Sequence, residues 1–377
     1  MTMRGDGQPS VMADVARRKA EHISTALQIG DSAGGSAGWD DVQLVHDALP
    51  DTDFGEVDLG IEFLGGHLLL PLLISGMTGG HQDALQVNGV LARAAAATGV
   101  MIGVGSQRAA LEDPAVVGSY AVVREEAPDA FVLANIGISQ LVDQPEGPAL
   151  QITDILGAID MVRADALAVH LNYLEEVVQP EGQTRARGAA QALRVLCREL
   201  PIPVIAKETG AGLSRDVALR LRDLGVCALD VGGRGGTSFA AIEARRAAAA
   251  GDVVRASTGQ AFAQWGIPTA ASVAMCSDVL PTIAVGGVRN GLDAARALSL
   301  GAVAVGVGRP LLEQALLGAD AVQDWIAAFA HQLRAAAFLA GVPSVRALPS
   351  ARSFLRGATR QWLDELAGDV RRGTQHD

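Results

Sequence analysis

The sequence predicts an α/β protein folded as a (β/α)8 TIM barrel. The chain has 377 residues, of which 49% are hydrophobic, 19% are charged and 44 are glycine. This composition offers enough apolar surface for a globular core and excludes disorder or a collagen-like rod. Short apolar runs alternate with Ala/Leu-rich stretches of helical period, and eight such runs occur. Eight strand–helix units close a barrel, and α/β barrels of this length form one domain.

The eight predicted strands are almost continuously hydrophobic, which is typical of parallel strands covered by helices on both faces. They span residues 68–75, 101–105, 131–137, 166–172, 203–208, 227–232, 282–286 and 302–306. A doubly wound open sheet is the alternative fold. That fold would carry G-x-G-x-x-G after a strand, and the sequence lacks this motif. The barrel is therefore favoured.

Further segments flank the predicted barrel. We expect, in order, a basic helix, a Gly/Ser linker and an acidic lead-in before it, at residues 11–28, 32–38 and 40–65. Two helices that pack outside the barrel are expected after it, at residues 321–341 and 361–366. The chain is thus divided into an N-terminal helical and loop extension, a (β/α)8 barrel and a C-terminal helical region, at residues 1–65, 66–318 and 319–377.

The charge balance limits the partners. There are 30 Lys and Arg against 42 Asp and Glu, a net charge of −12. This surface repels nucleic acid and anionic lipid, so neither is expected to bind. No apolar run approaches the roughly 20 residues of a membrane span. The three cysteines, Cys197, Cys227 and Cys276, lack the spacing of a metal site or a disulfide framework, which fits a soluble protein of the reducing cytoplasm.

Polar residues follow every predicted strand, and in a barrel these strand ends meet at one mouth. The last two tails are Gly286-Gly287-Val288-Arg289 and Gly306-Val307-Gly308-Arg309. Glycines there let backbone N–H groups approach an anion, as in a phosphate cup, and Thr237 could add a hydroxyl. The alternative is that the glycines only form tight turns. Two adjacent clusters, each followed by Arg, favour a phosphate-bearing cofactor.

The fourth strand ends in a second polar group. His170 and Asn172 lie two residues apart and point to the same side of the strand. Glu175, Glu176 and Glu181 follow, so this segment is rich in proton carriers and in oxygen ligands for Mg2+. The alternative is a core histidine followed by a solvated acidic loop.

Two charged clusters complete the set. Lys207 and Glu208 close a hydrophobic strand, where a charged pair is costly unless it faces a polar cavity. On the first helix, Arg18, Lys19 and His22 form a cationic patch. This patch is either a solvated face or an anion clamp held over the mouth.

Taken together, these motifs resemble the type 2 isopentenyl diphosphate isomerases, FMN-dependent (β/α)8-barrel enzymes. The resemblance runs from about Arg17 to Arg309. Its motifs are Arg18-Lys19-x-x-His22, Met77-Thr78-Gly79-Gly80, Gly105-Ser106-Gln107-Arg108, Ala134-Asn135-Ile136-Gly137, His170-Leu171-Asn172, Pro180-Glu181-Gly182, Lys207-Glu208, Gly235-Gly236-Thr237-Ser238 with Glu243, Trp265-Gly266-Ile267-Pro268-Thr269, and Gly286-Gly287-Val288-Arg289.

The resemblance implies interconversion of isopentenyl and dimethylallyl diphosphate over FMN that NADPH has reduced, with Mg2+. It implies proton addition to the terminal alkene carbon, a tertiary cation, and proton loss from the neighbouring methylene. The implied FMN contacts are Met77, Thr78, Gly79, Ser106, Asn135, Lys207 and Thr237, with a phosphate cup of Gly286, Gly287, Arg289, Gly308 and Arg309. The implied substrate contacts are Arg18, Lys19, His22, Arg108, His170, Asn172 and Glu175. Glu176 matches the Mg2+ ligand, and the implied catalytic residues are Glu175, Glu243 and His170. A homo-oligomer, tetramer or octamer, is also expected.

One departure from the family opens alternatives. The family places Gln before the Mg2+-binding Glu, where this chain has Glu175, and an acidic residue where it has Gln183. We hypothesise that Glu175 is a neutral acid of nearly the same shape as Gln. Alternatively, the new carboxylate directs the enzyme to another prenyl diphosphate or another product. An FMN-dependent 2-hydroxy-acid oxidase or dehydrogenase would need a late His, yet none lies between His170 and His331. A non-catalytic prenyl-diphosphate binder is the last alternative.

Overall fold

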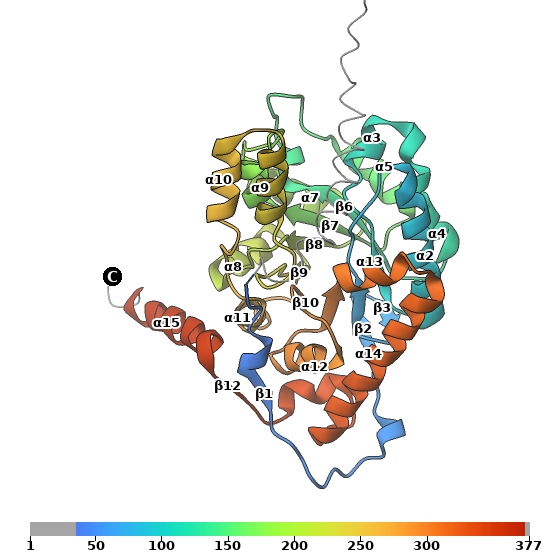
Figure 1. The fold of residues 1–377 in the computed structure, drawn as a ribbon, viewed down its shortest axis with the longest axis vertical. Helices are drawn as coiled ribbons and strands as arrows, with labels where there is room; N and C mark the ends of the chain where they lie inside the picture. Colours follow the sequence, from blue (N-terminus) through green and yellow to red (C-terminus); the bar gives the residue numbers. More distant parts are fainter. Residues whose placement is uncertain (1–34, 374–377) are drawn as a thin grey trace, which may run out of the picture.

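The computed structural model describes residues 35–373 and contains a closed barrel of eight strands (Figure 1). The strands run around the barrel in the order β10-β11-β4-β5-β6-β7-β8-β9, and every neighbouring pair is parallel. Their bounds are β4 Leu72–Ile74, β5 Met101–Gly103, β6 Val132–Gly137, β7 Ala166–Leu171, β8 Val204–Glu208, β9 Ala228–Asp230, β10 Thr282–Val285 and β11 Ala304–Val307. The predicted (β/α)8 fold is confirmed.

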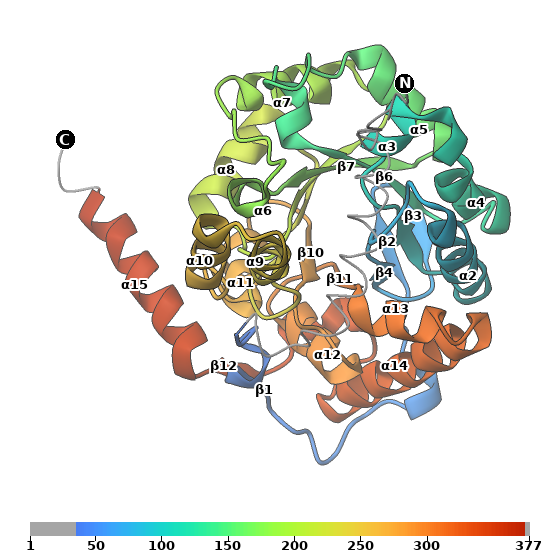
Figure 2. The same cartoon turned by 45° about the horizontal axis from the view of Figure 1, so that its top comes forward.

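Helices surround the strands and cover their outer face (Figure 2). They are α2 Gln82–Thr98, α3 Arg108–Glu112, α4 Gly118–Glu126, α5 Ile152–Val162, α6 Tyr173–Val178, α7 Ala189–Glu199, α8 Arg215–Leu224, α9 Phe239–Ala249, α10 Val253–Ala261, α11 Thr269–Cys276, α12 Gly291–Ser299 and α13 Arg309–Ala315. Local residues set their ends. In α8, for example, the Ser214 hydroxyl accepts from Val217 N at 3.3 Å, and Gly225 ends the helix at φ 101°. Within residues 35–373, every helix is too short or too polar to cross a lipid bilayer.

A small hairpin corrects the first predicted strand, 68–75. β2 (Ile61–Phe63) pairs antiparallel with β3 (Gly66–Leu68), so only the end of the predicted strand joins the barrel, as β4. Pro71 separates β3 from β4, and proline cannot donate to a strand ladder. Phe63 packs edge-on against Phe131, with ring centroids 5.9 Å apart. Because Phe131 immediately precedes β6, the hairpin lies at the N-terminal end of the barrel, opposite the mouth.

The described part of the predicted linker 32–38 is a packed segment. Ala37 and Trp39 are 5% and 4% exposed. Ala37 O accepts from Ala270 N at 2.9 Å, and Trp39 Nε1 donates to Gly286 O at 3.2 Å. A side chain at Gly235 would collide with the Ala37 backbone. Gly235 therefore lets its own backbone approach that of Ala37. The Gly/Ser-rich composition predicted a linker because it does not show this close packing.

The C-terminal region joins the barrel in two different ways. α14 (Ala319–Leu339) packs on α12 and α2, close to the predicted helix 321–341. α15 (Gly357–Gly373) is longer than the predicted 361–366 and follows β12 (Ser353–Leu355), which pairs with β1 (Val42–Leu44). The α15 backbone meets Asp41 through Thr359 N, 2.9 Å from Asp41 Oδ2. The helix then extends away from the barrel (Figures 1 and 2).

Candidate active site

A buried ion pair lies at the C-terminal ends of two neighbouring strands. Lys207 of β8 and Asp230 of β9 are paired in register, and Lys207 Nζ is 3.0 Å from Asp230 Oδ2. Their side chains are 14% and 2% exposed. Burial raises the pKa of Asp230, and the Lys207 ammonium opposes this rise. The sequence analysis identified Lys207 but missed Asp230, whose position at the end of a hydrophobic strand could have revealed it.

Two further predicted residues contact each other on the next strands. His170 Nδ1 and Asn135 Oδ1 are 2.8 Å apart, joining β7 to β6. The Asn135 amide is fixed, because its Nδ2 donates to Val104 O at 3.0 Å. Asn135 Oδ1 therefore accepts from His170 Nδ1, and this bond sets the imidazole tautomer. A side chain at Gly137 would press on His170 Nε2 at 2.9 Å, so this glycine leaves room for the ring.

The segment from Asn172 to Glu176 forms the acidic side of the mouth. Asn172 Nδ2 donates to Glu176 Oε1 at 2.9 Å and to Glu175 Oε2 at 3.3 Å. Gln183 N donates to the other Glu176 oxygen at 2.6 Å. Asn172 Oδ1 is buried and has no hydrogen-bond partner within residues 35–373. Mg2+ prefers oxygen ligands, and here a buried amide oxygen without a hydrogen bond lies on a residue that contacts the Glu176 carboxylate. Asn172 and Glu176 therefore fit the predicted metal.

No group of three or more His, Cys, Asp or Glu side chains in the described chain could hold a metal alone. Mg2+ is usually held by one or two carboxylates together with substrate phosphates, and Glu176 and Asn172 are the residues here that would hold it.

The loops after β4 and β5 contain the predicted FMN contacts Met77, Thr78, Gly79 and Ser106. The Thr78 hydroxyl is 2.9 Å from His81 Nε2, and Tyr120 OH donates to Ser106 O at 2.7 Å. Gly79 packs directly on the Tyr120 ring. These contacts fix the loop shapes. Predicted Arg108 starts α3 and pairs with Glu112 within that helix, at 2.7 Å.

The last two strand tails lie side by side, because β10 pairs with β11. Gly286 and Gly287 have φ values of 122° and 68°, which favour glycine. A side chain at Gly286 would collide with the carbonyl oxygen of Gly233, and one at Gly287 with that of Gly235. The close approach of the β9 tail therefore also requires glycine at both positions. Arg289 Nη2 lies 3.5 Å from Gly235 O.

The first and last tails also meet. A side chain at Gly308 would contact Met77 Sδ at 3.5 Å. Arg309 begins α13, with its Nε 3.8 Å from Glu313 Oε1. Ser75 Oγ at the end of β4 is buried and has no hydrogen-bond partner within residues 35–373. This unsatisfied hydroxyl, which was not predicted from the sequence, lies next to Gly306 and Gly308. A buried polar oxygen beside glycine-rich strand ends fits a polar, phosphate-bearing cofactor such as FMN.

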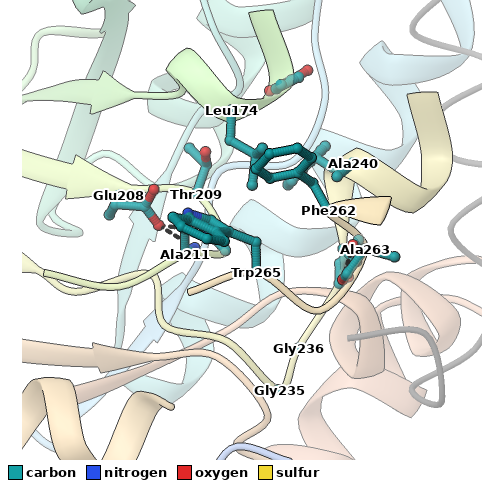
Figure 3. Close-up of a pocket in the computed structure, with 15 residues that line it drawn as sticks. Leu174, Glu208, Thr209, Ala211, Gly235, Gly236, Ala240, Phe262, Ala263 and Trp265 are labelled. Atoms are coloured by element: carbon teal, nitrogen blue, oxygen red, sulfur yellow. Dashed lines mark hydrogen bonds between the residues drawn. The ribbon is translucent and has the colours of Figure 1, made fainter. Parts of the chain in front are cut away.

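A small, open pocket lies between the β8 tail and the segments around α9 and α10 (Figure 3). The pocket is lined by Glu175, Thr237 and apolar side chains that include Leu174, Phe239, Phe262 and Trp265. Glu208 lies on one wall, and its Oε2 accepts from the N–H groups of residues 210, 211 and 212 at 2.7, 2.6 and 2.9 Å. Burial outweighs these bonds and raises the pKa of Glu208 to about 7.

Predicted Glu243 lies on α9 with a fully buried side chain. Its Oε2 is 2.6 Å from Arg246 Nη1, one turn along the same helix. Arg246 Nη2 in turn lies 3.2 Å from Glu181 Oε1. The predicted substrate residues Arg18, Lys19 and His22 lie outside the described residues.

The comparisons with known proteins fit this geometry. The chain is 43% identical to an isopentenyl-diphosphate delta-isomerase of Archaeoglobus fulgidus, over 93% of this chain and 98% of that protein. It is 44% identical to a protein of the same name from Methanococcoides burtonii, over 94% and 96% of the two chains. The chain belongs to the isopentenyl-diphosphate delta-isomerase family. The family resemblance seen in the motifs is thereby confirmed.

A family model described as FMN-dependent dehydrogenase matches residues 170–355 of this isomerase-family chain. Solved structures with similar folds include a flavocytochrome b2 variant with sulfite bound, at TM-score 0.63 and 20% identity, covering 88% of this chain and 80% of that one. A Pediococcus acidilactici lactate oxidase matches at TM-score 0.65 and 16% identity, over 94% and 97%. At these identities the likeness establishes the barrel fold alone.

Proposed function

We propose that this chain interconverts isopentenyl diphosphate and dimethylallyl diphosphate, using FMN reduced by NADPH, and Mg2+. The observation that carries the proposal is sequence identity of 43% and 44%, over 93% and 94% of this chain, to relatives named isopentenyl-diphosphate delta-isomerase. It is supported by the mouth of the barrel, because the FMN, substrate and metal residues implied by the resemblance within residues 35–373 lie on the strand ends or on the loops and helices that follow them.

The residues that would hold FMN include Ser75, Asn135, Lys207 and Thr237. The tails carrying Gly286, Gly287, Arg289, Gly308 and Arg309 would hold its phosphate. When bound and reduced, this group supplies an electron-rich ring that stabilises positive charge on the substrate. Lys207 places an ammonium there, and the Asp230 contact holds it in position.

The substrate diphosphate would be bound by His170, Arg108 and Asn172 together with Mg2+. Asn135 would orient the His170 ring for this contact, because its Oδ1 lies 2.8 Å from His170 Nδ1. Glu176 supplies the carboxylate ligand for Mg2+, oriented by Asn172 Nδ2 and Gln183 N.

The alkene end of the substrate would enter the apolar pocket. Leu174, Phe262 and Trp265 supply apolar lining there, which would limit the water around a short-lived cation. Glu175 lines the same pocket and would hold the transferred proton on its carboxyl group. Glu243 is a second proton carrier, held in position by Arg246.

A second candidate function rests on Glu175. This carboxylate lines the pocket, where it could remove a different proton, so the enzyme could act on another prenyl diphosphate or give a rearranged product. A 2-hydroxy-acid oxidase or dehydrogenase would need a histidine base after a late strand, and this sequence has no histidine between His170 and His331. A non-catalytic binder would hold the prenyl diphosphate with the same residues but would not convert it.

The remaining properties are also proposals. We propose a cytoplasmic homo-oligomer, tetramer or octamer, whose partners are small prenyl diphosphates rather than nucleic acid or membranes. The three free cysteines and the net charge of −12 support this assignment.

The experiment is to incubate the purified protein with FMN, NADPH, Mg2+ and isopentenyl diphosphate and to identify products by NMR and mass spectrometry. Dimethylallyl diphosphate from the native protein supports the proposal, and the matched Glu175→Gln variant is expected to form the same product. A different prenyl product supports the second candidate. Substrate binding without any product would leave the chain a binder.

A further inference from the structure

We propose that Arg246 is a positioning residue that couples Glu243 to the Mg2+ ligand Glu176 through the loop at residues 179–183. The inference rests on the proposed function and goes beyond it, because Arg246 is expected to touch neither substrate nor metal.

The first link joins Arg246 to Glu243. The Glu243 side chain has no exposed surface, and a carboxylate in that setting is costly unless it is paired. Arg246 Nη1 lies 2.6 Å from Glu243 Oε2, three residues further along α9. Removing the guanidinium would leave a buried carboxylate without this partner, so its position depends on Arg246.

The second link joins Arg246 to a different element. Its other terminal nitrogen, Nη2, lies 3.2 Å from Glu181 Oε1, in the loop that follows α6. The Arg246 side chain is 15% exposed and the Glu181 side chain 42% exposed, so the bridge runs from the buried α9 carboxylate to the surface loop. A planar guanidinium can hold two carboxylates at once, whereas a lysine ammonium acts as a point charge.

The third link joins the loop to Glu176. Gln183 N, two residues beyond Glu181, donates to Glu176 Oε2 at 2.6 Å. Between them, Gly182 packs so closely on the Glu176 carbonyl that a side chain there would overlap it. A displacement of Glu181 would therefore move the N–H group that orients the Glu176 carboxylate.

This chain of contacts gives Arg246 an effect at a distance. Groups that orient a metal ligand without touching the metal commonly change metal affinity by 10–100-fold when altered. We expect Arg246→Met and Glu181→Gln each to weaken Mn2+ binding by roughly tenfold. The double variant should weaken binding no further than the stronger single variant, because both act through one link. Arg246→Lys should restore part of the affinity.

The test measures Mn2+ binding directly, by electron paramagnetic resonance titration of the FMN-loaded protein with isopentenyl diphosphate present. The matched control is Arg255→Met on the neighbouring α10, which removes the same side chain from a pair with Asp252, at 2.7 Å, that does not reach the loop. Urea unfolding midpoints identify the variants that remain folded.

Tenfold weaker binding in folded Arg246→Met, with native binding in Arg255→Met, supports the inference. Binding within twofold of native in both Arg246→Met and Glu181→Gln overturns it, as does equal weakening in the control or no Mn2+ binding by the native protein. Failure of the proposed function looks different. In that case the native protein makes no isomerised product, while the Mn2+ titrations still rank the variants.

Discussion

Lys207 and Asp230 show how one buried charge depends on another. Their contact is 3.0 Å long and almost free of solvent. Removing one partner of such a pair typically costs 3–5 kcal/mol, because the other charge remains buried. We expect Lys207→Met to lower the free energy of unfolding of the FMN-free protein by about 3 kcal/mol, measured by urea denaturation.

The control for this prediction is Lys207→Met combined with Asp230→Asn. The double variant removes the stranded charge and should recover much of the lost stability. An unchanged urea midpoint in Lys207→Met would contradict the prediction.

Glu208 predicts a pH-dependent stability. Burial raises its pKa from 4.5 to about 7 in the folded chain. Between these values the folded protein binds a proton that the unfolded chain has released, so stability present below pH 4.5 is lost as pH rises toward 7. A shift of this size corresponds to about 3 kcal/mol.

Glu208→Gln keeps the oxygen that accepts from residues 210–212 but cannot ionise. Urea unfolding at pH 5 and pH 8 should therefore show a smaller loss of stability with pH in this variant than in the native chain. Equal losses in the two proteins would rule out Glu208 as the source.

At this scale the sequence predicts residue types better than partners. The two-residue spacing of His170 and Asn172 predicts that both lie on one side of a strand end, whereas β7 ends at Leu171 and Asn172 is the N-cap of α6. It does not predict that Asn135 accepts from His170, because the register between β6 and β7 comes from tertiary packing. Asp230 and Ser75 were not predicted for the same reason. Asp230 is identified by its contact with Lys207 on β8, and Ser75 by its position next to Gly306 on β11.

Among the elements, the β2–β3 hairpin carries a prediction about stability alone. Phe63 is 3% exposed and packs on Phe131 at the barrel end opposite the mouth. We expect Phe63→Ala to reduce the free energy of unfolding by about 3–5 kcal/mol, since it leaves a cavity in the core.

Because the hairpin is remote from the mouth, FMN affinity in folded Phe63→Ala should stay within about twofold of native, measured by fluorescence titration. A variant with native stability, or one that is folded but no longer binds FMN, would contradict this division of roles.

The strand–helix alternation predicts all eight barrel strands, because parallel strands buried on both faces are nearly continuous apolar runs. It does not separate β3 from β4, since Leu68 and Leu72 are both apolar and Pro71 lies between them. The packed segment at Ala37 was also missed. The Gly/Ser-rich composition of this segment is typical of linkers. Its packing becomes visible only in the structure, where Ala37 lies against Gly235 and Gly287.

For the whole molecule, closure of the barrel brings together groups that are far apart in the sequence. Met77 and Gly308 come from the first and last strand tails and lie next to each other. Strand count, strand direction and the polar tails predict this meeting, because the carboxyl ends of a parallel barrel share one mouth. The family resemblance added the chemistry, which the fold alone cannot supply, since oxidases share the same barrel.

If the proposed function is right, catalysis at this mouth uses reduced FMN without consuming electrons. The direct test is an anaerobic NMR time course with isopentenyl diphosphate in large excess and a single equivalent of NADPH per FMN. We expect many equivalents of dimethylallyl diphosphate for each NADPH oxidised. Product formation that stops at one equivalent, or that requires continued NADPH oxidation, would contradict it.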